Sequence, residues 1–330
     1  MPAGPKVSVA LPVRNGLPHL AETVEALRRQ TFRDFELVVQ DGLSTDGSAD
    51  YLRRAGLPFP VRLVSERDGS LVAGYNRAVR RCTGDLVVAA ACDEVLDDDA
   101  LEQYVSWYDE NPSALYIYGG SRILEPSGTL REFQPKDFRL IDYVRHQTCP
   151  TTAGAFNRRL LGREFYFDES LKSVPDFEFF TRVALRFGEG RILCKRAITM
   201  TARGDETSTS FRPSAFGQFA HDKRIVIDRL TKGRLRRALL ERLRSDAIFH
   251  MHAQFAEQIH GLAGDGPLFR EQVLAAQAAM PGHPEVRRLA AMSRHFRWDE
   301  AAQAAILRRN VAPLPPPREG PEVMRRIGRE

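Results

Sequence analysis

The sequence predicts an α/β fold with a mostly parallel sheet, followed by a region made only of helices. In the first half of the chain, short apolar runs alternate with amphipathic stretches, which is typical of βαβ units. After residue 213 the pattern is helical. The 330 residues, 43% of them hydrophobic, suffice for one large domain with an appendage. We therefore expect an α/β domain over residues 1–212, helices over residues 213–310 and a flexible, proline-rich tail over residues 311–330.

Strands and helices are expected in strict alternation at the start of the chain. The expected strands are residues 6–12, 35–40, 61–64 and 85–92. The last of these is apolar throughout, as a strand buried on both faces of a parallel sheet should be. The helices are expected near residues 18–30, directly after a turn at residues 44–47, and near residues 71–81. The first helix carries Leu20, Val24 and Leu27 on one face.

Polar residues follow the ends of all four of these strands. They are Asn15, Asp41, Asp68 and the pair Asp93 and Glu94. In an open parallel sheet, ligands bind in the crevice outside the carboxyl ends of the strands. The sequence therefore predicts that these side chains converge on one crevice.

Beyond residue 110 the alternation is weaker. We expect strands at residues 114–118 and 191–194, a hairpin turn at residues 125–128 and a helix over residues 174–187. Helices should then fill residues 214–309, with breaks at Gly233, around Gly266 and at residues 281–284.

Several ordered motifs resemble one known family. Residues 7–15 (VSVALPVRN), 30–47 (QTFRDFELVVQDGLSTDG), 65–69 (SERDG), 73–78 (AGYNRA) and 83–85 (TGD) look like the opening of the family 2 inverting glycosyltransferases of GT-A fold. The resemblance covers about residues 6–210 and does not include the helical region.

The resemblance implies a nucleotide site on the first two strand ends. It assigns the donor nucleotide to Pro12, Val13, Arg14, Asn15 and Asp41, with Asp68 reaching the same pocket. A carboxylate can accept a hydrogen bond from a base N–H, and a glycine such as Gly42 lets the backbone approach closely. Two other interpretations stay open, because an Asp-Gly pair is also an ordinary turn and Asp68 also suits a solvated loop.

The family also has a DxD metal motif at the end of the fourth strand, where Mn²⁺ or Mg²⁺ bridges the donor phosphates. The matching register assigns the metal to Asp93 and Glu94, whereas Ala91 stands at the first Asp position. One carboxylate can be enough for a hard cation that keeps waters and takes phosphate ligands. The run of three aspartates at residues 97–99 is better interpreted as the first turn of the next helix.

By the same resemblance, Asp176 is the general base that takes the proton from the acceptor hydroxyl. The alternative is that Asp176, directly after Pro175, only caps its helix. Glu178 is expected to be a supporting residue. Family members often have Arg-x-His near residue 203, whereas this chain has Arg203-Gly204-Asp205. Arg203 can neutralise phosphate, and Asp205 could supply the metal carboxylate that is missing at Ala91.

Positive charge is concentrated in the helical region. Residues 211–330 hold 21 Lys and Arg against 13 Asp and Glu, whereas residues 1–210 hold 27 against 30. Residues 229–244 form a basic amphipathic stretch that could contact an anionic membrane, although core packing, or an interface with a second copy or a partner, explains it as well. No aromatic platform accompanies these arginines, so nucleic acid is not an expected partner.

The four cysteines are widely spaced, so reduced thiols are expected, with neither a disulfide nor a zinc site. Together with an opening that lacks a signal-peptide core, this favours a cytoplasmic protein, and the basic stretch leaves peripheral contact with the inner face of the membrane open. The function predicted is inverting hexosyl transfer from a nucleotide-diphosphate sugar, UDP-linked, to a saccharide or lipid-linked acceptor in surface polysaccharide or glycoconjugate synthesis. Two alternatives stay open: a sugar-nucleotide nucleotidyltransferase, and a non-catalytic protein that either binds a nucleotide sugar or acts as a scaffold.

Overall fold

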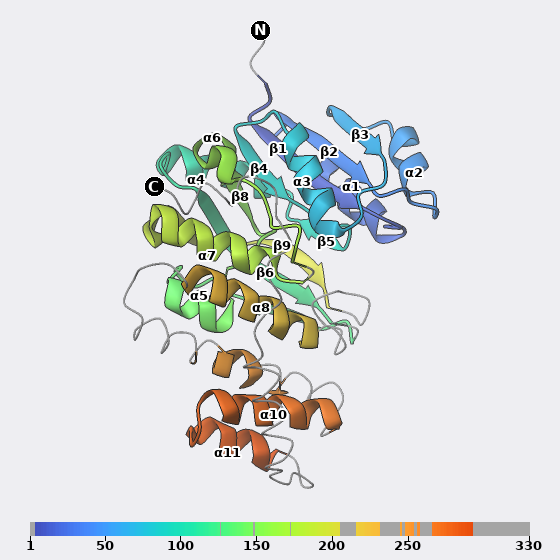
Figure 1. Cartoon of the computed structure of the whole chain (residues 1–330). Coiled ribbons are helices and arrows are strands. Elements are labelled where there is room, and N and C mark those ends of the chain that lie inside the picture. The colour runs from blue at the N-terminus through green and yellow to red at the C-terminus, as the bar shows by residue number, and fades with distance from the viewer. Residues whose placement is uncertain are drawn as a thin grey trace. The chain divides into compact units, whose positions relative to one another are not determined.

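The computed structural model describes residues 4–125, 127–147, 149–171, 173–204, 216–231, 245, 248–253, 256–257 and 266–292. The chain divides into two compact units. The first consists of Met1–Glu169 and Val174–Arg212, and the second of Ser170–Ser173 and Pro213–Glu330. Figure 1 shows both units.

The first unit is built on one curved sheet, and the predicted α/β fold is confirmed. Over the described residues the sheet has nine strands in the order β3-β2-β1-β4-β8-β6-β9-β5, with β7 paired to β6. The strands β1 to β4 are parallel, whereas β8 runs antiparallel to both of its neighbours and β5 antiparallel to β9. Their bounds are β1 Val7–Val13, β2 Phe35–Asp41, β3 Val61–Ser65, β4 Leu86–Ala89, β5 Glu94–Leu96, β6 Tyr116–Leu124, β7 Leu130–Phe133, β8 Gly154–Asn157 and β9 Ile192–Arg203.

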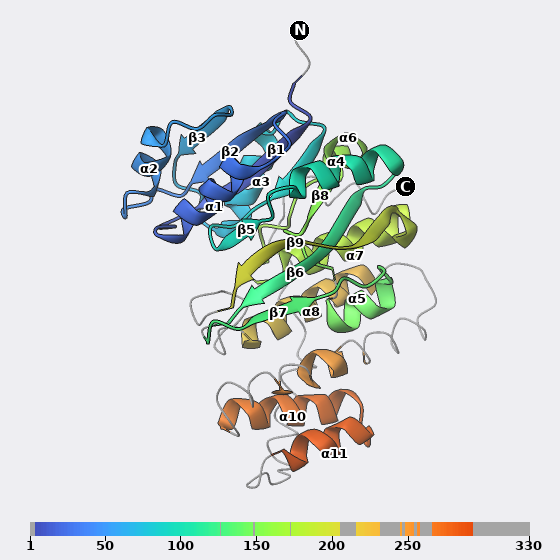
Figure 2. The same ribbon diagram turned by 180° about the vertical axis from the view of Figure 1, so that it is seen from behind.

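Helices cover both faces of the sheet. In Figure 2, α1 (His19–Arg29) and α4 (Ala100–Glu110) lie in front of it, and they share one apolar core with α2 (Ser48–Arg54) and alternate residues of the strands. In Figure 1, α3 (Leu71–Arg81) and α7 (Pro175–Phe187) lie in front, on the opposite face. The short α5 (Leu140–His146) and α6 (Arg158–Leu161) complete this unit, with two 3-10 turns, Gly162–Glu164 and Glu189–Arg191.

An aromatic cluster joins α7 to the sheet. Phe180 packs on Tyr116 of β6, with 4.9 Å between ring centroids, and Phe179 lies edge-on to Phe156 of β8 at 5.5 Å. Tyr143 of α5 stacks on Phe177 at 5.8 Å. All six side chains are buried, so α5 and α7 are packed firmly on this face.

The structure differs from the expected elements in several places, of which three concern the sheet near the predicted site. The strand predicted at residues 85–92 stops at Ala89, and a turn precedes the separate, antiparallel β5. The strand predicted at residues 191–194 extends to Arg203, because its partners are the long β6 and β5. Strand β8, which is central in the sheet, was not expected at all, since its four residues show neither an apolar run nor a regular alternation.

The described part of the second unit is helical, as predicted. It contains α8 (Phe216–Thr231), α10 (Pro267–Ala279) and α11 (Pro284–Ala291), and the last two begin at the expected breaks. Its core includes Phe249, Phe269, Val273 and Leu289. Most of the basic stretch at residues 229–244 and the whole proline-rich tail lie outside the described residues. No helix in the described ranges is long and apolar enough to cross a membrane.

His252 in this second core should make stability depend on pH. Its Nδ1 lies 2.8 Å from Oε1 of Gln272. Burial, together with the positive charge of Arg224, lowers the pKa of His252 to about 4, although the Gln272 hydrogen bond acts in the opposite direction. The unfolded chain takes up a proton here below about pH 6.5, so the free energy of unfolding falls as the pH drops from about 6.5 to 4.

We expect the wild type to lose about 2–3 kcal/mol more unfolding free energy than His252→Gln between pH 7 and pH 4.5. Urea unfolding of both proteins at the two pH values measures this difference, and the comparison cancels the carboxylates that titrate in both. Equal losses in the two proteins would contradict the prediction.

Candidate functional site

The carboxyl ends of β1, β2 and β3 lie side by side, as the sequence predicts. Val13 pairs with Asp41, and Asp41 pairs with Ser65. The Gly42 N–H donates to the Val13 carbonyl at 2.8 Å, so the two loops leave the sheet together. Pro12 and Val13 are buried in β1, whereas Arg14 is exposed at its end.

The loops after β1 and β2 are held to each other by reciprocal hydrogen bonds. The Asn15 N–H donates to Ser44 Oγ at 2.8 Å, and the Thr45 N–H donates to Asn15 Oδ1 at 2.8 Å. The Leu17 N–H donates to Asp46 Oδ2 at 2.9 Å. Asn15 adopts φ of 54°, a left-handed conformation that asparagine tolerates better than most residues. Arg14 and Asn15 therefore stand exposed on a well-ordered rim.

Asp41 is fully buried, and its carboxylate binds the loop that follows β2 and the last residue of β3. Its Oδ1 accepts from the Ser44 N–H at 3.0 Å, and its Oδ2 accepts from the Ser65 hydroxyl. Asp41 therefore does stabilise the turn that follows β2, as the turn interpretation expects. A carboxylate has further lone pairs, and nucleotide binding by Asp41 stays a prediction.

The Asp68 carboxylate lies between two glycines. A Cβ atom at Gly42 would lie 2.9 Å from Asp68 Oδ2, and one at Gly74 of α3 would lie 3.0 Å from the same oxygen and 3.1 Å from Pro12. Any side chain at either glycine would displace the carboxylate. The structure thus brings Asp68 together with Pro12 and the Asp41-Gly42 turn, as predicted.

The turn that carries Asp93 and Glu94 joins β4 to β5. The Thr23 hydroxyl of α1 lies 2.8 Å from the carbonyl oxygen of Cys92 and 2.9 Å from that of Glu94, which fixes the turn against α1. The Arg203 N–H at the end of β9 donates to the Asp93 carbonyl at 3.2 Å, and the Arg203 guanidinium pairs with Glu22 of α1. Asp93 and Arg203 therefore lie next to each other, although they are far apart in sequence.

The two carboxylates of this turn differ. The Asp93 carboxylate makes no hydrogen bond or ion pair with any described residue. The Glu94 carboxylate turns back into the protein, where it accepts from the Ala91 N–H at 3.2 Å and from the Thr152 hydroxyl at 2.7 Å. Burial raises the pKa of Glu94 to about 7, and the charge of Asp93 adds to this effect. Asp93 is thus the better placed of the two predicted metal ligands.

No three His, Cys, Asp or Glu side chains gather as a metal site within the described residues. Asp205 lies outside those residues. The aspartates before α4 have other partners: Asp97 pairs with Arg122 at 2.9 Å and Asp98 with Arg29 at 2.9 Å. A cation that keeps its waters and binds phosphate would fit the Asp93 carboxylate, which no described residue engages.

Asp176 lies in the first turn of α7, and its Oδ2 accepts from Gln147 Nε2 at 2.6 Å. Gln147 ends α5 in a left-handed conformation with φ of 51°. The same short segment carries Thr152, the partner of Glu94. Glu178 is buried and binds Arg182 at 2.7 Å, which is a supporting contact.

Sequence reasoning missed Gln147, Thr152, Ser65 and Gly74. Glutamine, threonine and serine carry no local signal for a role, and Gly74 lies within a regular helical pattern. The partners of Ser65, Gln147 and Thr152 are 24 to 58 residues away along the chain, and Gly74 matters because it contacts Asp68 and the distant Pro12. Only the folded chain brings these partners together.

The part of the chain that carries these strand ends matches a known protein family. The family described as "Glycosyl transferase family 2" matches residues 8–165. These residues belong to glycosyl transferase family 2. The matched range includes all the strand ends described above, from Pro12 to Glu94, whereas Asp176 and Arg203 follow it.

Individual glycosyltransferases resemble the chain over a wider range. The chondroitin synthase of Escherichia coli is 23% identical over 209 residues, which cover 62% of this chain and 30% of that protein. The chain spans only 21% of another curated relative. Its matches to these proteins are therefore confined to part of their length.

Solved structures of low sequence identity share the fold. S. aureus TarS 1-349 in complex with UDP-GlcNAc has a TM-score of 0.62 and 18% identity, covering 92% of this chain and 90% of that one. The mannosyltransferase PcManGT from Pyrobaculum calidifontis, in complex with GDP-Man and Mn²⁺, has a TM-score of 0.56 and 20% identity, covering 94% and 88%. The expected GT-A fold is thereby confirmed.

Proposed function

We propose that this chain transfers a hexosyl group, with inversion, from a UDP-linked donor to a saccharide or lipid-linked acceptor in polysaccharide or glycoconjugate assembly. One observation carries the proposal: Pro12, the Asp41-Gly42 turn and Asp68 are packed together at adjacent strand ends. Membership of the family supports glycosyl transfer. The relatives' names, chondroitin synthase and TarS in complex with UDP-GlcNAc, support the polysaccharide product and the UDP donor.

The donor nucleotide would lie against the rim formed by the first two loops. Asp68 can accept hydrogen bonds from a base N–H or a ribose hydroxyl, and the exposed Arg14 and Asn15 can contact the phosphates. Arg203 can add positive charge near Asp93 once its guanidinium exchanges Glu22 for phosphate. The positions of these side chains in the first unit support these roles.

Asp93 would hold a divalent cation together with the donor phosphates. The complex of PcManGT with Mn²⁺ supports this assignment. Such a cation supplies positive charge against the departing nucleotide diphosphate. Glu94 would keep the turn in place through Ala91 and Thr152.

Asp176 would act as general base. As the acceptor oxygen forms its bond to the anomeric carbon, its proton passes to the Asp176 carboxylate, and the bond to the nucleotide diphosphate breaks on the opposite face. This single displacement inverts the anomeric centre. The hydrogen bond from the Gln147 amide to Asp176 Oδ2 at 2.6 Å would hold this carboxylate in a fixed orientation.

Nucleotide binding provides the first test. Calorimetric titration of UDP and of GDP, each with and without Mn²⁺, should show metal-dependent UDP binding that weakens at least about tenfold in Asp93→Ala, because the metal then loses its carboxylate. Asp109→Ala, at an exposed position of α4, is the control. UDP binding that depends on neither the metal nor Asp93 would overturn the metal role. The absence of any nucleotide binding would overturn the proposed function and favour a scaffold protein that binds no nucleotide.

A further inference from the structure

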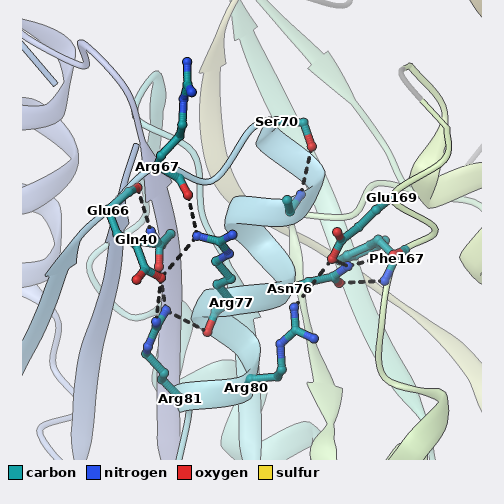
Figure 3. A network of polar contacts seen from close by, with 11 residues as sticks. Gln40, Glu66, Arg67, Ser70, Asn76, Arg77, Arg80, Arg81, Phe167 and Glu169 are labelled. Atoms are coloured by element: carbon teal, nitrogen blue, oxygen red, sulfur yellow. Dashed lines mark hydrogen bonds and ion pairs between the residues drawn. The ribbon is translucent and has the colours of Figure 1, made fainter. Parts of the chain in front are cut away.

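Helix α3 presents two different polar faces, which are drawn in Figure 3. Gly74, Arg77 and Arg81 are spaced three and four residues apart, so they lie on one side of the helix. Asn76 and Arg80 lie on the next side. Each side binds a different segment of the first unit.

The first side holds the loop that follows β3. Arg77 Nη1 donates to the Arg67 carbonyl at 2.6 Å and to Glu66 Oε1 at 3.2 Å. Arg81 Nη2 reaches the same Glu66 oxygen at 2.8 Å, while its Nη1 donates to Gln40 of β2. Figure 3 shows both guanidinium groups on this loop, with the Arg67 side chain directed away from them.

The backbone of the loop is also attached to β2. The Glu66 N–H donates to the Asp41 carbonyl at 2.9 Å, and Gln40 Nε2 approaches the Glu66 carbonyl at 3.4 Å. The hydrogen bond and charge of Arg81, followed by those of Arg77, hold the pKa of Glu66 below its ordinary value. Glu66 is thus a charged link between the helix and the loop.

Asp68 is the next residue but one after Glu66 and the neighbour of Arg67. Its carboxylate rests on Gly74, one turn before Arg77 on the same side of α3. The contacts of Arg77 therefore fix the backbone immediately before Asp68, while Gly42 and Gly74 limit where its carboxylate can go. A loop fixed at its backbone loses less entropy when a ligand binds.

The second side of α3 contacts a different segment, residues 167–169. Asn76 Nδ2 donates to the Phe167 carbonyl at 2.8 Å, and the Phe167 N–H donates to Asn76 Oδ1 at 2.8 Å. Arg80 is 68% exposed and lies 3.5 Å from Glu169. Arg80 has the same charge and the same helix as Arg77 but does not touch the Asp68 loop, so it offers a matched control.

We infer that Arg77 and Arg81 are positioning residues that preorganise the Asp68 loop for the donor nucleotide. The inference rests on the proposed function for its ligand, but the ordering of the loop can be measured without any ligand.

The test compares Arg77→Met, Arg77→Lys and Arg80→Met with the wild-type chain. We expect Arg77→Met to weaken UDP binding about tenfold, with a similar rise in the donor KM and an unchanged kcat, because charged hydrogen bonds of this kind are lost. Arg77→Lys should recover most of the UDP affinity, since one ammonium group can reach both the Arg67 carbonyl oxygen and the Glu66 carboxylate. Arg80→Met should bind UDP as the wild type does.

Hydrogen exchange of the unliganded proteins completes the test. Amides of residues 65–70 should exchange at least several-fold faster in Arg77→Met, with no change in Arg80→Met. Unchanged exchange in Arg77→Met overturns the inference, whatever nucleotide binds. Faster exchange with wild-type UDP affinity also overturns it, whereas a wild-type chain that binds no UDP overturns the proposed function but leaves the exchange result to decide whether Arg77 orders the loop.

Discussion

Replacing Asp176 with asparagine is expected to lower kcat by about 100- to 10,000-fold. Asparagine keeps the size of the side chain and can still contact Gln147, but it cannot take the acceptor proton. The donor KM and the affinity for UDP should stay near their wild-type values, because Asp176 is assigned to the acceptor and not to the nucleotide. UDP release in the presence of UDP-sugars and saccharide acceptors measures the rate.

A second aspartate serves as the control for this variant. Asp50 also lies in the first turn of a helix, α2, where it is 62% exposed and pairs with Arg53 at 2.8 Å. Asp50→Asn should leave kcat unchanged. If Asp176→Asn keeps more than about a tenth of the wild-type kcat, Asp176 is only a helix-terminal carboxylate and the base must be sought elsewhere.

Arg182→Leu is expected to lower the free energy of unfolding by about 3–5 kcal/mol. The Arg182 side chain is 8% exposed and binds Glu178 at 2.7 Å and Glu164 at 3.1 Å. It also donates to the Tyr166 carbonyl at 2.8 Å, and its guanidinium carbon lies 4.3 Å from the centre of the Tyr166 ring. Leucine would remove the cation that Glu178 binds within α7 and one of the two cations near Glu164.

Urea unfolding followed by circular dichroism measures this loss. Arg186 is the matched control, because it lies one turn further along α7, is 50% exposed and approaches Glu164 at 3.4 Å. Arg186→Leu should change the free energy of unfolding by less than about 1 kcal/mol. A loss below about 1 kcal/mol in Arg182→Leu would mean that the network adds little to stability.

Local patterns in the sequence predict the first half of the fold well. The helix expected at residues 71–81 matches α3, and the first three strands begin within one residue of the expected positions. Apolar runs, helical periodicity and Gly-containing turns depend on neighbours in the sequence, so they are visible without the fold. Asn15, Asp41, Asp68 and Asp93 follow the ends of four successive strands. Their positions also predict one crevice, since parallel strands end at the same edge of a sheet.

Later elements were harder to predict because they depend on distant partners. The four residues of β8 form a strand because β4 and β6 lie on either side of them. Likewise, the length of β9 follows from its pairing with β6 and β5. A short segment between two such neighbours needs no strong periodicity of its own.

The sequence by itself determined the α/β class, the helical character of the second unit and the residue types available for chemistry. The tertiary structure decided how those residues are used. It turned Glu94 inward onto Thr152, set Gln147 against Asp176 and placed Arg77 behind the Asp68 loop. Each of these contacts joins residues 10 to 58 positions apart, and the direction in which a polar side chain points depends on which donor or acceptor folding brings within hydrogen-bond reach.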